Sequence, residues 1–142
     1  MIYRKEIDKA LMWLFETQNK ECFGWSWVRD ISPNEQNTAE VVYAATLFCD
    51  ILTENQKQLI NEAVRAWLLL PRKHAVLTID WVWVGLALTK YAEQYAVYGP
   101  DFGLEFVKND IRDCVEAILA LQNPDGGWGD YKRDLSTTFR TA

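Results

Sequence analysis

Residues 117–142 read AILALQNPDGGWGDYKRDLSTTFRTA, a stretch that combines the end of a helix, a tight turn and the start of another helix. The apolar run ends at Gln122, a Gly-Gly-Trp turn follows, and Thr141 opens a new helical pattern. The same parts occur in the same order near the N-terminus, in the stretch ALMWLFETQNKECFGWSWVRDISPNEQNTAEVVYAATLF at residues 10–48. This recurrence indicates an internal repeat.

The two copies align residue by residue. Gln18 matches Gln122 at an offset of 104 positions, and Trp25 matches Trp128 at an offset of 103. Upstream, both copies carry an apolar stripe with the i, i+4, i+7 spacing of one helix face. The stripe consists of Ile7, Leu11 and Leu14 in the first copy and of Ile111, Val115 and Ile118 in the second. We therefore expect one unit at about 3–52, its copy at 103–142, and a helical hairpin at 55–95 between them.

The pattern predicts helices throughout, at about 3–18, 38–52, 55–70, 78–95 and 103–122, and no segment alternates as a strand should. Thr38 and Thr78 are N-cap candidates, Pro71 closes the third helix, and Gly99-Pro100 separates the fourth helix from the fifth. The first, third and fifth helices are charged on one face, whereas VVYAATLF and WVWVGLAL are apolar nearly all round and are expected to be buried.

Composition narrows the class of protein. The formal charge of −5, without a Lys/Arg stripe, argues against nucleic-acid binding. No apolar run reaches the roughly 18 residues of a membrane span, and no signal-peptide pattern opens the chain, so a cytoplasmic protein without a membrane span is expected. The three cysteines, Cys22, Cys49 and Cys114, lack the spacing of a metal site and are interpreted as reduced thiols.

Alternating charged and apolar helices predict helical hairpins stacked side by side, and a specific resemblance extends this prediction. The first copy has Trp13-Leu14-x-x-x-Gln18 followed by Gly24-Trp25, and the second has Gln122-Asn-Pro-Asp-Gly-Gly-Trp-Gly129. These resemble the Gln-Trp repeats of terpene cyclases of the squalene-hopene and oxidosqualene type, whose α/α toroid is shared with protein prenyltransferases. The resemblance implies an all-α fold, a single partial α/α toroid over 1–142. The first copy departs from the pattern at Phe23, where a glycine is expected.

The repeat residues are interpreted as structural. A glutamine at the end of an outer helix can offer its amide to the free backbone groups of a helix terminus, and a tryptophan can shield those bonds from water. Gly126 and Gly127 permit the positive φ of a tight turn. This structural set comprises Gln18, Trp25, Gln122, Gly126, Gly127 and Trp128.

The resemblance also implies where catalytic groups should lie. Class II cyclases carry an acidic aspartate just before a Thr-Ala helix start. The matching stretches here are Gln36-Asn37-Thr38-Ala39-Glu40 and Phe139-Arg140-Thr141-Ala142, and neither carries the acid. A neutral amide has no acidic proton to donate to an alkene, so Gln36 can only polarise a ligand.

Two further chemistries are not supported by the sequence. The prenyltransferase branch implies a zinc site with Asp, Cys and His ligands, but the single histidine, His74, has no cysteine near it in sequence. The thioester branch of the superfamily implies a Cys-Gly-Glu-Gln signature, which is absent. No metal and no cofactor is expected.

One acid is a catalytic candidate. Asp80 opens the most apolar predicted helix, where it would lie beside Trp81 and Trp83 at the mouth of a cavity. An aspartate in the first turn of a helix is, however, favoured by capping and the helix dipole alone, and this structural interpretation is preferred. The predicted ligand-pocket residues are Asp80, Trp81 and Trp83, together with Gln36 and Tyr43.

Two functions remain open. The first is a non-catalytic toroid module, a scaffold or an interaction unit for a protein or an apolar, isoprenoid-like ligand. The second is an N-terminal piece of a squalene-hopene-cyclase-like terpene cyclase or prenyl-processing enzyme. Because the second copy lacks the inner helix that follows the first, an apolar flank is expected at each open edge. Self-association, or a second chain that completes the ring, is the expected remedy.

Overall fold

The computed structural model describes residues 1–28, 30–69 and 75–141. Within these ranges the chain is helical and contains no strand, so the all-α prediction is confirmed. The elements are α1 (Arg4–Thr17), α2 (Glu35–Thr46), the 3-10 turn η1 (Cys49–Ile51), α3 (Glu54–Ala63), the π-helical segment η2 (Val64–Leu69), α4 (Thr78–Glu93), α5 (Tyr95–Tyr98), α6 (Leu104–Ala120) and α7 (Thr138–Thr141).

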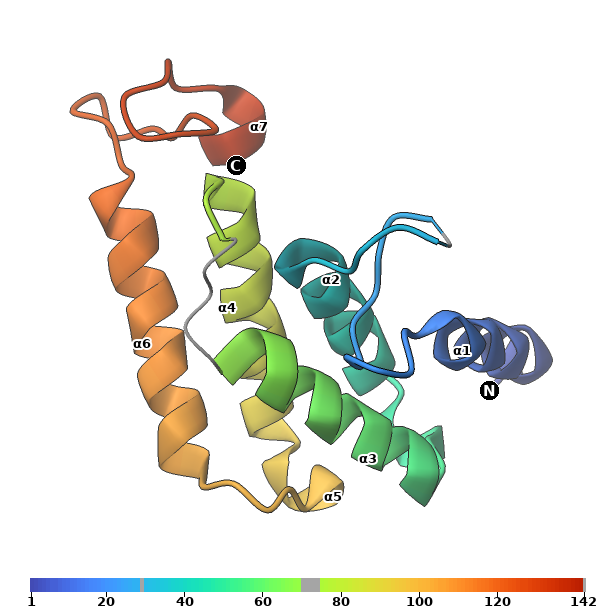
Figure 1. The fold of residues 1–142 in the computed structure, drawn as a ribbon. Helices are drawn as coiled ribbons and strands as arrows, with labels where there is room; N and C mark the ends of the chain where they lie inside the picture. The colour runs from blue at the N-terminus through green and yellow to red at the C-terminus, as the bar shows by residue number, and fades with distance from the viewer. Residues whose placement is uncertain (29, 70–74, 142) are drawn as a thin grey trace.

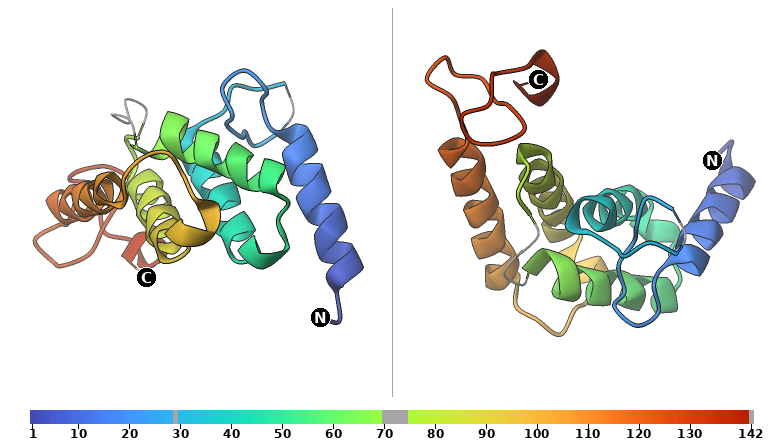
Figure 2. Two further views of the ribbon diagram at one scale, coloured as in Figure 1. Left: turned by 90° about the horizontal axis from the view of Figure 1, so that it is seen from below. Right: turned by 45° about the horizontal axis from the view of Figure 1, so that its top comes forward.

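Helices α2 and α4 lie side by side at the centre of the molecule (Figure 1). Helix α6 packs along the other flank of α4, and α3 with η2 lies across the central pair. The two further views show α1 and α6 at opposite ends of the assembly (Figure 2). The two repeat copies therefore lie at the two edges of the fold, and the hairpin between them supplies much of the middle.

The apolar sequences of α2 and α4 build the core where these helices meet. Ala39, Val42, Val84 and Leu88 have no exposed surface. One face of this pair is nevertheless open to solvent, since Leu86 keeps 46% of its surface exposed. The prediction that both helices are buried all round is therefore right for the faces toward α3 and α6 and wrong for the face on the opposite side.

A buried polar network fastens the central helices to their neighbours. The Tyr91 hydroxyl donates to Asn61 Oδ1 at 2.7 Å, and Asn61 Nδ2 donates to the Tyr98 carbonyl at 3.0 Å. The Tyr98 hydroxyl pairs with Thr46 Oγ1 at 2.9 Å. Burial raises the pKa of Tyr91 well above its usual value, so the hydroxyl stays protonated and keeps its donor role. The network links α2, α3, α4 and α5.

Two predicted helix starts need correction. Helix α2 begins at Glu35, three residues before the predicted N-cap Thr38, because the Asn34 side chain accepts from the Asn37 N–H and caps the helix. Thr78 is the first residue of α4, and its N-cap is Leu77. Threonine is a common N-cap, but Thr38 and Thr78 use their hydroxyls for tertiary contacts instead.

The other boundaries agree more closely. Helices α1 and α6 end within two residues of the predicted positions, and α4 ends near the prediction but is followed by the short α5. Gly99 closes α5 with a left-handed φ of 51°, as expected of the Gly99-Pro100 break. The predicted end of the third helix at Pro71, and the loop histidine His74, lie outside the described residues.

Gly24 lies where an indole crosses the backbone. Trp67 of η2 donates its Nε1–H to the Cys22 carbonyl at 2.8 Å. A Cβ atom on Gly24 would lie 2.5 Å from Trp67 Nε1 and 2.6 Å from Pro33 Cβ, which is far closer than van der Waals contact. Only glycine therefore fits between the loop that joins α1 to α2 and the helix that covers it.

We predict that Gly24→Ala lowers the free energy of unfolding by about 1–3 kcal/mol, because the added methyl group forces Trp67 or Pro33 to move. Gly103→Ala is the matched control, since a Cβ there meets its nearest neighbour at an ordinary 3.6 Å. Urea unfolding of both variants measures the difference. Equal stabilities for the two variants would contradict this packing.

Candidate functional site

The first repeat copy forms a clamp between α1 and α2. The indole Nε1–H of Trp25 donates to the Leu14 carbonyl at 2.7 Å, which satisfies an unpaired carbonyl in the last turn of α1. The backbone N–H of Trp25 donates to Thr38 Oγ1 at 3.0 Å, inside α2. Gln18 Nε2 donates to the Phe23 carbonyl at 2.7 Å and closes the turn. One tryptophan thus ties the end of one helix to the start of the next.

The second copy repeats these bonds. Trp128 Nε1 donates to the Ile118 carbonyl at 2.7 Å, and the Trp128 backbone N–H donates to Thr141 Oγ1 at 3.0 Å. Gln122 Nε2 donates to the Gly126 carbonyl at 2.8 Å. Every donor and acceptor occupies the position that the sequence alignment predicts. The repeat found in the sequence is therefore a repeat of one hydrogen-bonded structure.

The roles within the clamp differ from the prediction in one respect. Glutamine was expected to satisfy the helix terminus, with tryptophan shielding it from water. The tryptophan indole satisfies the terminal carbonyl itself, and the glutamine amide holds the turn. Gln18 makes only a longer contact of 3.4 Å with a neighbouring helix, at the Leu59 carbonyl of α3.

The turn glycines serve two different purposes. Gly126 adopts a left-handed φ of 87°, as predicted, whereas Gly127 does not. A Cβ on Gly127 would instead lie 2.6 Å from Ser136 Cβ, so this glycine is needed for close approach. Phe23 occupies the position of Gly126 in the first copy and takes a φ of 63°, which is strained for a side chain of this size. Its packing against the core offsets that strain.

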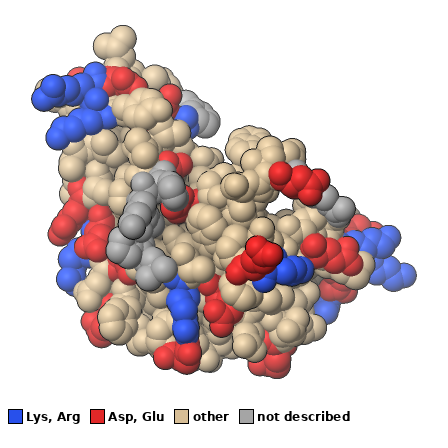
Figure 3. Space-filling model, in the orientation of Figure 1, with Lys and Arg blue, Asp and Glu red and all other residues tan. Residues whose placement is uncertain are grey.

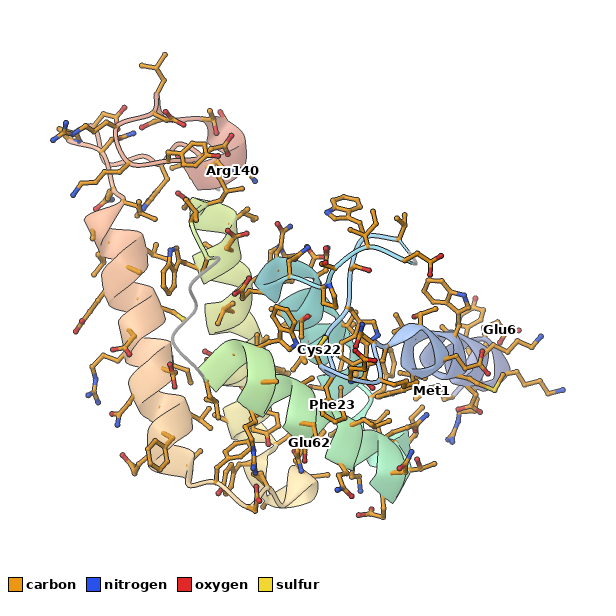
Figure 4. The ribbon with its side chains drawn as sticks, in the orientation of Figure 1. Met1, Glu6, Cys22, Phe23, Glu62 and Arg140 are labelled. Atoms are coloured by element: carbon orange, nitrogen blue, oxygen red, sulfur yellow. The ribbon has the colours of Figure 1, made fainter. Side chains whose placement is uncertain are left out.

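The copies differ strongly in burial. Trp25 and Gln18 each keep only 3% of their surface exposed, whereas Trp128 is half-buried and Gln122 is exposed. The first copy is more buried because η2 and α3 cover it. Figure 4 shows Phe23 of the first copy beside α3, whereas Arg140 of the second copy lies far from α3, on α7. The second copy has no such covering helix among the described residues.

Polar contacts hold the second copy in place instead. Thr78 at the start of α4 donates its hydroxyl to the Gly129 carbonyl at 2.8 Å and its backbone N–H to the Asp130 carbonyl at 3.0 Å. Asp130 also forms an ion pair with Arg140. The pKa of Asp125 is lowered because the carboxylate accepts first from the Gly127 N–H and then from the Ser136 hydroxyl.

The predicted pocket residues do not all meet. The Asp80 carboxylate accepts from the backbone N–H groups of Val76 at 3.1 Å and Leu77 at 3.0 Å, so it caps α4. This geometry agrees with the structural interpretation of Asp80. Gln36 donates to Glu40 Oε1 at 3.0 Å on its own helix.

Two aromatic residues of the predicted pocket, Tyr43 and Trp83, do contact each other. Tyr43 of α2 and Trp83 of α4 meet edge to face, with ring centroids 5.9 Å apart and planes at 71°. Trp81 is also half-buried, and all three rings pack partly against the core. The open face of the α2–α4 pair therefore carries an aromatic pair, and Leu86 lies exposed on α4 beyond it. This face therefore offers aromatic and aliphatic surface.

Three residues that the sequence prediction did not single out for a site line a groove on the first copy. Trp13, Trp27 and Glu40 come from α1, the following loop and α2, and they border one cavity of about 470 Å³. The available signal was the density of tryptophans around Gln18, but spacing alone assigned those residues to the repeat.

Within the described ranges the structure has neither a cluster of metal-ligating side chains nor a membrane-spanning helix. No set of three or more His, Cys, Asp or Glu side chains within the described ranges is placed to hold a metal ion. Among the described helices, none combines the length and apolar character needed to cross a bilayer.

Comparison with models of known protein families, with curated proteins and with solved structures gives no match to this chain.

We predict that Trp25→Ala lowers the free energy of unfolding by about 3–5 kcal/mol, because it removes a buried indole together with its hydrogen bond to the Leu14 carbonyl. Trp128→Ala is the matched variant, with the same bonds but a half-buried ring, and should cost clearly less. Denaturant unfolding of both proteins measures the gap. A larger loss for Trp128→Ala would mean that the second copy is the better packed one.

Proposed function

We propose that the protein is a non-catalytic helical-repeat module, a partial α/α toroid that acts as an interaction unit through the faces of its repeat helices. The observation that carries this proposal is a difference between equivalent helices. In α1, Leu11 and Phe15 keep only 5% and 6% of their surfaces exposed, whereas the equivalent Val115 and Leu119 of α6 keep 49% and 59%. The face that one copy buries is open in the other.

On the opposite faces of these two helices the burial is reversed: α6 is buried and α1 is exposed. Val107 and Cys114 of α6 pack against the central helices with no exposed surface. Their counterparts in α1 are Tyr3, which is 67% exposed, and Ala10, which is also exposed. Each edge of the fold thus presents a surface that the repeat itself is built to cover with another helix.

A second copy of the chain is the partner that we favour. Val115 and Leu119 are four residues apart, so they lie on one face of α6 and can pack against the same face of another α6 across a two-fold axis. Paired apolar residues of this kind gain free energy when they leave water. A different helical chain that completes the ring would use the same surface.

Light scattering coupled to size-exclusion chromatography tests the association. We expect dimers at micromolar concentration, and we expect Leu119→Lys to give monomers because it places a charge in the apolar contact. Leu135→Lys is the control, since Leu135 is 89% exposed on the C-terminal loop and should leave the dimer intact. A wild-type chain that remains monomeric, or two variants that behave alike, would contradict the proposal.

A second candidate function rests on the open face of the α2–α4 pair. Tyr43 and Trp83 offer aromatic surface there, and exposed Leu86 adds aliphatic surface. Such a face suits an apolar ligand of the isoprenoid type, which needs contact area rather than hydrogen bonds. The site would bind such a ligand without transforming it.

We predict that the purified protein does not cyclise squalene or an oxidised polyprenyl substrate. Gln36 and Asn37 directly precede Thr38, at the positions where a class II cyclase would carry its acidic aspartate. Both of these side-chain amides donate to the Glu40 carboxylate. Mass spectrometry of the extracted products, against a boiled control, gives the answer. Cyclised product above that control would instead favour the alternative, a piece of a terpene cyclase.

A further inference from the structure

The groove on the first copy differs in chemistry from both surfaces of the proposed function. Its floor is Trp25, whose ring is held by the bond to the Leu14 carbonyl. Its rims carry Trp13, 55% exposed, and Trp27, 78% exposed. Both indoles line the cavity and stay exposed, so a ligand that enters it can contact two large aromatic rings.

The loop that carries Trp27 has a defined turn. Ser26 donates its hydroxyl to the Val28 carbonyl at 2.6 Å, which closes the backbone directly around Trp27. Thr17 of α1 donates to the Leu14 carbonyl at 2.9 Å and completes the wall below. The indoles are therefore mounted on hydrogen-bonded backbone on both sides of the groove.

A carboxylate lines the same groove as the indoles. Glu40 of α2 lines the same cavity, and its two oxygens accept from Gln36 Nε2 at 3.0 Å and from Asn37 Nδ2 at 3.5 Å. These amides fix the side chain without neutralising it. Among the described residues that line the groove, Glu40 is the one with a charge, and none of them is Lys, Arg or His.

This combination selects against most ligands. A purely apolar ligand would cover the charged Glu40 carboxylate without supplying an opposite charge, which is costly. An anion would be repelled. A neutral polar ligand would leave the indole faces unused, whereas a cation with an apolar surface satisfies both the carboxylate and the rings.

We propose that the groove binds a methylated ammonium group, with the cation over the faces of Trp13 and Trp27 and its charge balanced by Glu40. A quaternary ammonium is more weakly hydrated than a free lysine amine and so loses less on entering the groove. Figure 3 shows both acidic and basic side chains near the hollow beside the loop between α1 and α2, and the charge that lines the groove itself comes from Glu40.

The test is a titration of the full-length chain with choline, followed through the indole N–H signals in NMR spectra at constant ionic strength. The comparison ligand is the neutral carbon isostere of choline, in which a tert-butyl group replaces the trimethylammonium group. We expect choline to shift the Trp13 and Trp27 signals and to bind about tenfold more tightly than the isostere, because only the cation gains from the rings and the carboxylate.

Variants locate the site. Trp27→Ala and Glu40→Gln should each weaken choline binding about tenfold, and Trp27→Ala changes an exposed loop residue that the fold does not need. Glu16→Gln is the matched charge control, since Glu16 lines a different cleft on α1, and it should bind like the wild type. A short peptide with one trimethyllysine forms a second arm, and binding there would identify a protein source rather than a small molecule.

Two results would overturn the proposal. Equal affinities for choline and its neutral isostere would show that the groove does not recognise charge. Unchanged choline affinity in both Trp27→Ala and Glu40→Gln, with their spectra otherwise folded, would place any binding elsewhere. Trp27→Ala and Glu40→Gln act through different groups, so a folding defect in one of them leaves the other as a test.

Discussion

The bond from a tryptophan indole to the last turn of a helix is the interaction on which this structure depends. Helix termini leave carbonyl groups unpaired, and a chain that turns sharply there must satisfy them without water. Trp25 does so for Leu14, and its own backbone N–H reaches Thr38 in the next helix. One residue therefore holds both helices, and the same bonds recur in the second copy, where Trp128 joins Ile118 to Thr141.

Repetition of the clamp creates the surfaces that matter for function. The first copy is covered by α3 and η2, so its inner side is packed and its outer side is free. The second copy packs on α4 and leaves the opposite side free. This difference between the two edges supports the proposal of an interaction module.

The clamp also builds the groove. The bond from Trp25 to Leu14 holds the loop against α1, and Trp27 of this loop lines the same cavity as Trp13 of α1. Thr38, the other anchor, fixes α2 so that Glu40 faces the same cavity. A structural motif thereby positions the residues that carry the recognition chemistry proposed for this surface.

The sequence by itself determined the helices, the repeat and the pairing of Gln18, Trp25 and Thr38 with their later counterparts, because helical periodicity and turn chemistry are local. It placed the start of α2 at Thr38, since it could not show that Asn34 would cap the helix while Thr38 bonded to Trp25. Only the tertiary structure decided which copy is buried and that Trp13, Trp27 and Glu40 share a groove. Identical local patterns differ in burial because burial depends on which distant helix covers them, and spacing along the chain carries no record of that neighbour.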